Sequence, residues 1–186
     1  MGAKVIAVVQ PKGGTGKSTI SAHLAVALEQ RGGAVALIDC DPQGSLTRWH
    51  SLREQWLGKG YTGVYFAAIS GWRLRSEIER MKGRFSVIVI DGPAHNDIDT
   101  RNALRCADIA LIPMQPGPTD LWAMEHITGM ADVKRVPYAT VFNRVNHQSK
   151  LARAMEKAVP GLTGARLGNR VAFAVSMLHG QTAMEM

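Results

Sequence analysis

A glycine-rich turn between an apolar run and a helical pattern is the feature that most limits what this chain can fold into. The run Lys4–Gln10 (KVIAVVQ) has the composition of a short buried strand. The turn that follows it ends in Gly16, Lys17 and Ser18, and apolar residues then recur at helical spacing. This order predicts a phosphate-binding loop of the G-x-x-x-x-G-K-[ST] type, in which Pro11 replaces the first glycine.

The residues of this loop have the properties that phosphate binding requires. Successive backbone N–H groups from Gly13 to Ser18 can curl around a phosphate, and the following helix adds the positive end of its dipole. Lys17 can reach the β and γ phosphates, and the Ser18 hydroxyl can ligate Mg²⁺. The predicted phosphate-site residues are Gly13, Gly14, Thr15, Gly16, Lys17, Ser18 and Thr19. An extra lysine, Lys12, has no place in the standard motif.

Further apolar runs alternate with helical patterns along the chain. After the first strand, the predicted strands are Ala34–Cys40, Val64–Ala67, Phe85–Ile90, Ile109–Ile112 and Tyr138–Phe142. Nearly all-apolar strands that alternate with helices predict an α/β fold, a mainly parallel twisted sheet with helices on both faces, of the P-loop NTPase type. We expect a single domain over residues 1–186, because the length is close to the common domain size.

Carboxylates follow two of these strands, at the edge where parallel sheets bind ligands. Asp91 follows a β-branched run, where a Walker B carboxylate belongs, and it can hold Mg²⁺ directly or through water. Asp39 and Asp41 stand at alternate positions of another strand end, so we expect them to point the same way. Either of the two could orient an attacking water, and the spacing alone does not distinguish them.

Basic residues are concentrated in the last third of the chain. The net charge is +7, and in residues 134–180 Glu156 is the single acidic residue. The basic residues of this segment are Lys134, Arg135, Arg144, Lys150, Arg153, Lys157, Arg166 and Arg170. This imbalance favours a polyanion partner such as nucleic acid, although solvated helix faces can have the same composition.

Four motifs, in order along the chain, resemble those of a known family. The segments "PKGGTGKST", "DCDPQGS", "VIVIDGPA" and "PMQPGPTDLW" are similar to the ParA type of partition ATPase, within the ParA/MinD group that carries a deviant Walker A motif. The resemblance runs from about Lys4 to the end of the chain. It implies an ATPase that uses ATP and Mg²⁺ and that hydrolyses ATP slowly until a partner stimulates it.

The resemblance also implies roles for particular residues. Lys12 corresponds to the signature lysine, which each of two ATP-bound subunits inserts into the other's phosphate site, as an arginine finger does. Asp41 corresponds to the carboxylate that positions the attacking water, and Asp91 to the Walker B aspartate. Asn143 stands where family members contact the adenine. The implied catalytic residues are Lys12, Lys17, Asp41 and Asp91, Lys12 also joins the ATP-binding set, and the implied magnesium ligands are Ser18, Asp41 and Asp91.

The function that the resemblance implies is the ATP-driven positioning of a cargo. ATP closes a homodimer, the dimer binds DNA without sequence preference, and a separately encoded ParB-like adaptor on the cargo stimulates hydrolysis and release. Such a protein works in the cytoplasm, associated with the nucleoid, and has no membrane partner. The residues expected to contact DNA phosphates are Lys150, Arg153, Arg166 and Arg170.

Two alternative classes share the same kind of loop. A membrane-surface positioning ATPase of the MinD kind needs a basic amphipathic C-terminal helix, but no Lys or Arg follows Arg170. A P-loop ATPase that assembles metal cofactors needs bridging cysteines, whereas we expect Cys40 and Cys106 to be small buried residues.

Histidines and tryptophans receive structural roles in this interpretation. The histidines show no metal-ligand spacing, so we expect packed or surface positions for His23, His50, His95, His126, His147 and His179. His95 is the one nearest to the predicted chemistry. The tryptophans lie in or beside predicted helices, and we expect core positions for Trp49, Trp56, Trp72 and Trp122.

Overall fold

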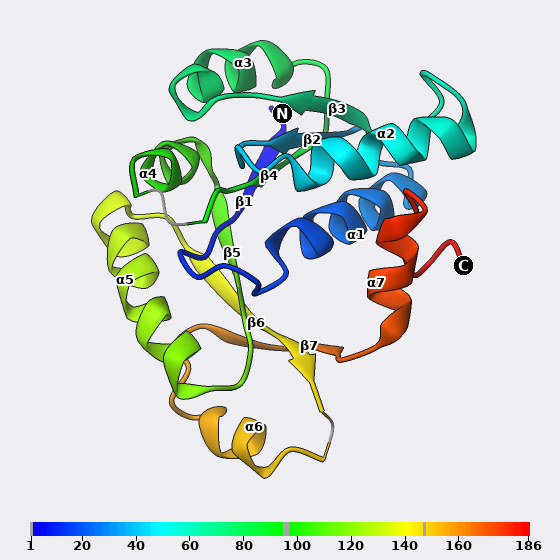
Figure 1. The fold of residues 1–186 in the computed structure, drawn as a ribbon. Helices are drawn as coiled ribbons and strands as arrows, with labels where there is room; N and C mark the ends of the chain where they lie inside the picture. Colours follow the sequence, from blue (N-terminus) through cyan, green and yellow to red (C-terminus); the bar gives the residue numbers. More distant parts are fainter. Residues whose placement is uncertain (1, 95–96, 147) are drawn as a thin grey trace.

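The strands of this computed structural model, which describes residues 2–94, 97–146 and 148–186, form one parallel sheet (Figure 1). They are β1 Lys4–Val8, β2 Val35–Asp39, β3 Tyr65–Ala68, β4 Val87–Asp91, β5 Ile109–Met114, β6 Tyr138–Val145 and β7 Leu162–Gly168. The order across the sheet is β3-β2-β4-β1-β5-β6-β7, and each neighbouring pair is parallel. The predicted parallel α/β fold is confirmed.

Helices cover both faces of this sheet. They are α1 Lys17–Gln30, α2 Ser45–Leu57, α3 Leu74–Met81, α4 Asp97–Cys106, α5 Pro118–Lys134, α6 Lys150–Met155 and α7 Val171–Leu178, with a 3₁₀ turn η1 at Gly71–Arg73. The helices α1, α2 and α7 lie on one face, and α3, α4 and α5 lie on the other (Figure 1). In β4, Ile88 and Ile90 belong to the core of the second face and Val89 to the core of the first. Burial on both faces explains why the central strands are apolar throughout.

The apolar pattern predicts neither β7 nor α7. β7 is an edge strand whose middle residues 164–166 are exposed, so it lacks a continuous apolar run. α7 (VAFAVSML) is apolar except for Ser176, and Ser176 is its buried residue. A helix that is apolar on all sides has no amphipathic period from which its ends could be predicted.

The prediction that the tryptophans lie in the core is correct for one of the four. Trp49 is 2% exposed, whereas Trp56, Trp72 and Trp122 are 44%, 80% and 65% exposed, so the prediction is wrong for these three. On α5, the buried stripe includes Met124. Trp122 stands two positions earlier, about 200° around the helix, and therefore faces solvent.

The segment that follows α7 is bound to both α1 and α2. The buried Arg53 of α2 donates two hydrogen bonds to the carboxylate of Glu185, at 2.7 and 3.0 Å. On α1, the His23 Nε2 accepts a hydrogen bond of 2.9 Å from the backbone N–H of Ala183, and Nδ1 lies 2.7 Å from the Thr19 carbonyl oxygen. These partners fit a neutral imidazole with its proton on Nδ1.

We expect acid to weaken this attachment through His23. Burial lowers the pKa of His23, against the opposing effects of the Thr19 carbonyl and Glu185. His23 in the unfolded chain then binds a proton more readily than His23 in the folded chain. The contribution of neutral His23 to the free energy of unfolding is therefore complete above about pH 6.5 and decreases as the pH falls below that value. His23→Gln should make the melting temperature fall less between about pH 7 and pH 5. Thermal unfolding at several pH values tests this, and identical pH profiles for the two proteins would contradict it.

Candidate functional site

The glycine-rich loop connects β1 to the first residue of α1 at the carboxyl edge of the sheet. Gly14 and Gly16 have φ angles of +76° and +92°, a region that residues with a side chain rarely adopt. Gly16 directly precedes Lys17, the first residue of α1, so the loop ends at a helix N-terminus. This arrangement is the one that favours binding of an anion such as phosphate.

Asn143 holds this loop from the end of β6. Its Nδ2 donates a hydrogen bond of 2.7 Å to the Thr15 carbonyl oxygen, and its Oδ1 accepts one of 2.9 Å from the Arg144 backbone N–H. A Cβ atom on Gly16 would lie 2.2 Å from the same Nδ2. Asn143 therefore contacts the loop backbone itself, and its expected contact with adenine stays a prediction.

We expect Gly16→Ala to reduce nucleotide binding by about a hundredfold or more. The added Cβ requires both an unfavourable φ angle and displacement of Asn143, which would distort the phosphate-binding backbone. Titration with a fluorescent ATP analogue measures the effect. Gly129→Ala is a matched control, because a Cβ at Gly129 in α5 would contact nothing within 4 Å. Wild-type affinity in Gly16→Ala would contradict the role of this loop.

Lys17 and Asp91 form the charged centre beside the loop. Lys17 is buried and its Nζ donates a hydrogen bond of 3.3 Å to the Lys12 carbonyl oxygen. Burial lowers the pKa of Lys17, while the charges of Asp91 and Asp41 oppose the shift. Burial also raises the pKa of Asp91 to about 7, against hydrogen bonds from Ser18 and Ser21 and the charge of Lys17. The negative charges of Asp91 and Asp41 thus favour the protonated form of Lys17.

The Asp91 carboxylate fits the magnesium role predicted for it. Asp91 is fully buried, and its Oδ1 accepts a hydrogen bond of 3.0 Å from the Ser21 hydroxyl. Its Oδ2 has no hydrogen-bond partner within the described residues. A buried carboxylate oxygen without a partner is costly unless a ligand uses it, and carboxylate and hydroxyl oxygens are the ligands that Mg²⁺ prefers. Asp91 and Ser18 are therefore suited to hold Mg²⁺.

The structure gives different surroundings to the two carboxylates at the end of β2, Asp39 in its last residue and Asp41 two residues later. Asp39 is buried, and its Oδ2 accepts hydrogen bonds of 2.9 Å from both the backbone N–H and the hydroxyl of Thr47. Its Oδ1 accepts a third from the Asp41 backbone N–H at 3.1 Å. Asp41 is half-buried, and its Oδ1 accepts a hydrogen bond of 3.0 Å from the Gln43 N–H. Asp39 therefore fixes the start of α2, which leaves Asp41 as the candidate for catalysis.

The side chain of Lys12 contacts the first turn of α5. Its Nζ donates a hydrogen bond of 3.0 Å to the Thr119 hydroxyl and forms an ion pair with the Asp120 carboxylate. Asp120 is buried, and it also accepts a hydrogen bond of 3.0 Å from the Gln115 backbone N–H. The side chain of Lys12 is thus held within its own subunit by the first turn of α5.

Sequence reasoning gave no role to Ser21, Gln115, Thr119 or Asp120. Ser21 lies three positions after Ser18, on the same side of α1, and this spacing could have identified it. The other three belong to the segment "PMQPGPTDLW". In the sequence analysis this segment served only to identify the family, and it assigned no role to any single residue. Gln115 Nε2 donates a hydrogen bond of 3.2 Å to the Gly14 carbonyl oxygen, which attaches this segment to the loop.

The four residues expected to contact DNA are all exposed. Lys150 and Arg153 lie on α6, Arg166 lies near the end of β7, and Arg170 precedes α7. The Arg166 guanidinium is 2.8 Å from the Glu156 carboxylate, so its charge is partly compensated. Their role in DNA binding stays a prediction.

The prediction that both cysteines are buried is correct for Cys40 and wrong for Cys106. Cys40 is buried and Cys106 is half-buried, and burial raises the pKa of both thiols. Within the described residues, no group of three or more His, Cys, Asp or Glu side chains is arranged to hold a metal ion. None of the described helices has both the length and the apolar composition of a membrane span. The predictions for His95 and His147 lie outside the described residues.

Comparisons with known proteins agree with this geometry. A model of the CobQ/CobB/MinD/ParA nucleotide binding domain matches residues 6–176. The chain is 32% identical over 167 residues to maintenance of carboxysome distribution protein A of Halothiobacillus neapolitanus, a match that covers 84% of this chain and 74% of the relative. It is 31% identical over 116 residues to protein ParA of Rhizobium radiobacter, which covers 62% of this chain and 50% of the relative. The chain thus spans about three quarters of the first relative and half of the second.

Solved structures have the same fold. MinD of Pyrococcus horikoshii, solved with Mg-ADP, superposes with a TM-score of 0.81 at 22% identity, which covers 98% of this chain and 88% of that one. A variant of McdA from Cyanothece, solved with ATP, gives a TM-score of 0.80 at 16% identity, with 98% and 90% covered. At these identities the similarity establishes the fold, and the family model together with the sequence relatives establishes descent. The chain therefore belongs to the CobQ/CobB/MinD/ParA family of nucleotide-binding domains, within its ParA/MinD group of P-loop ATPases.

Proposed function

We propose that this chain is a single P-loop ATPase domain, residues 1–186, that positions a cargo. Mg²⁺-ATP closes a face-to-face homodimer, the dimer binds DNA without sequence preference, and a separately encoded ParB-like adaptor stimulates hydrolysis and release. Relatives of this chain are named for carboxysome distribution and for chromosome partitioning, in Halothiobacillus neapolitanus and Caulobacter vibrioides respectively. These names support a positioning role. Binding to DNA would keep the protein on the nucleoid, in the cytoplasm.

The position of Lys12 is the observation that carries this proposal. A second loop lysine used in its own site would be expected beside Lys17, where it would add to the charge on the phosphates. The Lys12 ammonium instead binds Thr119 and Asp120 at the start of α5. Once Lys12 leaves this ion pair, its ammonium can serve the phosphate site of a neighbouring subunit, as an arginine finger does.

Each of the remaining site residues has a separate role in ATP hydrolysis. The loop N–H groups from Gly13 to Thr19 and the Lys17 ammonium orient the phosphates, and Ser18 and Asp91 hold Mg²⁺, which when bound supplies positive charge to those phosphates. Asp41 orients the attacking water. Hydrolysis by the protein alone should be slow, because the second Lys12 arrives only when the dimer forms.

Binding to DNA rests on the exposed basic residues of the C-terminal third. A DNA phosphate can be neutralised by each of Lys150, Arg153, Arg166 and Arg170. Such contacts release cations that had condensed on the DNA, and this release is less favourable at high salt concentration. The affinity for DNA should therefore fall as the salt concentration rises. The net charge of +7 supports the same partner.

The test is sedimentation of wild type, Lys12→Ala and Asp41→Ala with Mg²⁺-ATP, with and without nonspecific duplex DNA. We expect wild type and Asp41→Ala to form dimers that bind DNA in a salt-sensitive manner. Lys12→Ala should remain monomeric, because its partner site lacks the inserted charge. If Lys12→Ala dimerises and binds DNA as wild type does, the proposal is wrong.

Asp120→Asn is a matched variant for the same experiment. It keeps an oxygen for the Gln115 N–H but removes the negative charge that holds Lys12. We expect it to dimerise at a lower protein concentration than wild type, because no ion pair has to break before Lys12 reaches the other subunit. A monomeric Asp120→Asn protein would show that Asp120 acts within the dimer instead.

A further inference from the structure

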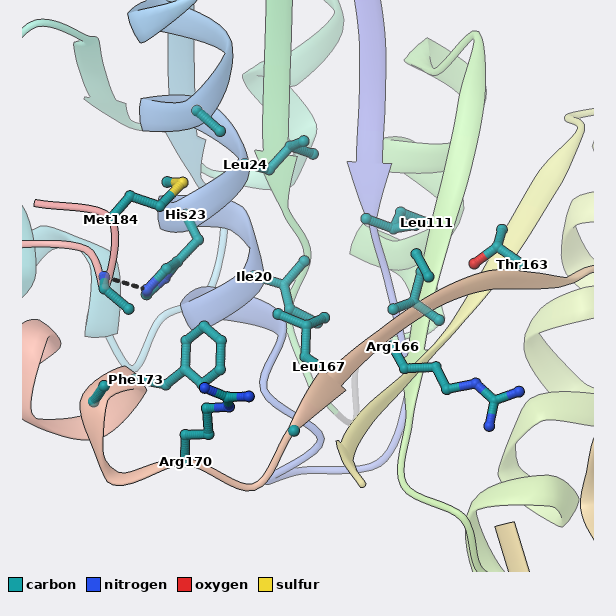
Figure 2. A pocket seen from close by; sticks show the side chains of 16 residues that line it. Ile20, His23, Leu24, Leu111, Thr163, Arg166, Leu167, Arg170, Phe173 and Met184 are labelled. Carbon is teal, nitrogen blue, oxygen red and sulfur yellow. Dashed lines mark hydrogen bonds between the residues drawn. The ribbon is translucent and has the colours of Figure 1, made fainter. Parts of the chain in front are cut away.

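The backbone carbonyl groups of the phosphate loop are held in place by neighbouring elements. On the α1 side, the Gly16 carbonyl oxygen accepts a hydrogen bond of 2.9 Å from the Ile20 N–H. The Ile20 side chain itself lines the groove between α1 and α7 (Figure 2). On this side the loop is therefore held by the backbone of the helix. The two carbonyls before Gly16 are held by side chains from elsewhere in the sheet.

These two side chains come from the ends of β5 and β6. Gln115 Nε2 donates a hydrogen bond of 3.2 Å to the Gly14 carbonyl oxygen, and Asn143 Nδ2 donates one of 2.7 Å to the Thr15 carbonyl oxygen. Gln115 directly follows β5, and Asn143 lies near the end of β6. The order of strands is β1-β5-β6, so both side chains approach the loop from the same side of β1. Two successive peptide units of the loop are thus oriented together.

The orientation of these carbonyls fixes the direction of two N–H groups. A trans peptide unit, as all the described ones are, points its C=O and its N–H in opposite directions. Holding the Gly14 and Thr15 carbonyls therefore turns the N–H groups of Thr15 and Gly16 away from β5 and β6. Within the part of the chain that the structure describes, neither N–H has a hydrogen-bond acceptor. Because Thr15 is buried, such an N–H is costly unless a ligand accepts its hydrogen bond.

The turn that carries Gln115 is itself fixed to the segment that leads into the loop. The Gln115 backbone N–H donates a hydrogen bond of 3.0 Å to Asp120, and Asp120 forms the ion pair with Lys12. The carbonyl oxygen of Pro113 accepts a hydrogen bond of 3.3 Å from Gln10 Nε2. A side chain whose own backbone is held on both sides can keep the group that it contacts in one orientation.

We propose that Gln115 is a positioning residue for phosphate binding, which holds the Gly14 carbonyl so that the Thr15 N–H points at the bound phosphates. It acts through the loop backbone and does not touch the nucleotide. An N–H group that is already oriented binds an anion without the cost of turning its peptide unit. The proposal rests on nucleotide binding by the loop and depends neither on the dimer nor on DNA.

The test is calorimetric titration of the nucleotide-free protein with ADP and with inorganic tripolyphosphate. Gln115→Met keeps the length of the side chain and removes its N–H donor. We expect the affinities for both ligands to fall by the same factor, about threefold to tenfold, because the change concerns the phosphates alone. Gln55→Met is the matched control, since Gln55 is an exposed residue of α2, and it should keep both wild-type affinities.

Two further measurements separate positioning from a general structural role. The Thr15 amide proton signal should move downfield when ADP binds to wild type, because that N–H then donates to a charged oxygen, and it should move less in Gln115→Met. The melting temperature of the nucleotide-free variant should stay within about 2 °C of wild type. Gln115 is half-buried, and its side chain makes one hydrogen bond among the described residues.

Gln115→Glu gives a graded comparison. A carboxylate of the same length cannot donate to the Gly14 carbonyl, and its negative charge repels the phosphates. We expect a larger loss of affinity than in Gln115→Met. The difference between the two variants should decrease at high salt concentration, because salt screens the repulsion but does not restore the missing donor.

Three results would overturn the proposal. The first is wild-type affinity of Gln115→Met for both ligands. The second is a loss of affinity for ADP without a loss for tripolyphosphate, which would mean that Gln115 acts on the nucleoside. The third is a reduced affinity with an unchanged shift of the Thr15 amide proton, which would mean that Gln115 does not act through the loop. A failure of dimer formation or of DNA binding would change none of these measurements.

Discussion

Asp91→Asn is expected to reduce Mg²⁺-dependent ATP hydrolysis by about a thousandfold, the largest effect predicted for a substitution in this site. Asn keeps the size of the side chain and an oxygen for the Ser21 hydroxyl. It lacks the negative charge, and the atom that replaces Oδ2, which has no partner among the described residues, cannot ligate a cation as a carboxylate oxygen does. Steady-state phosphate release, measured across Mg²⁺ concentrations, is the assay.

The same substitution should leave the fold intact or stabilise it. Because burial raises the pKa of Asp91 to about 7, the nucleotide-free protein loses stability as the pH rises from the unfolded value of 3.8 through 7. Asn does not ionise, so the variant avoids this loss, and its melting temperature at about pH 8 should equal or exceed that of wild type. Loss of activity together with a lower melting temperature would instead mean that Asp91 is a structural residue.

The sequence predicts the phosphate loop and Asp91 because their positions follow from local patterns. A strand, a glycine-rich turn and a helix are adjacent in the chain, and an aspartate after a β-branched run must lie at a carboxyl edge. The ion pair between Lys12 and Asp120 could not be predicted in this way, because the two residues are separated by more than half of the chain. Only the order of the strands, which places β5 beside β1, brings them together.

The same distinction applies to the fold. The central strands are apolar throughout because both faces are buried, so β1, β2 and β4 could be predicted from their residues. β7 is an edge strand with an exposed middle, and its conformation comes from pairing with β6 rather than from its own sequence. For Trp122, the residue type alone predicted burial and was misleading. Its position on α5 directs the side chain to solvent, where it is 65% exposed.

Asp41→Asn and Asp39→Asn are expected to have different consequences, although the two carboxylates are separated by one residue. Asp41→Asn should reduce ATP hydrolysis by about a hundredfold or more, because an amide orients and polarises an attacking water less well than a carboxylate does. It should retain dimerisation and the wild-type melting temperature, since the Asp41 side chain accepts one local hydrogen bond, from Gln43.

Asp39→Asn should instead reduce stability by about 1–3 kcal/mol, because a carboxylate that accepts three hydrogen bonds would be replaced by an amide with one oxygen. Burial raises the pKa of Asp39, and the hydrogen bonds from Thr47 and from the Asp41 backbone N–H oppose that shift. Thermal unfolding and single-turnover hydrolysis of both variants separate the two roles. If Asp39→Asn lost hydrolysis at an unchanged melting temperature and Asp41→Asn did not, the catalytic assignment would move to Asp39.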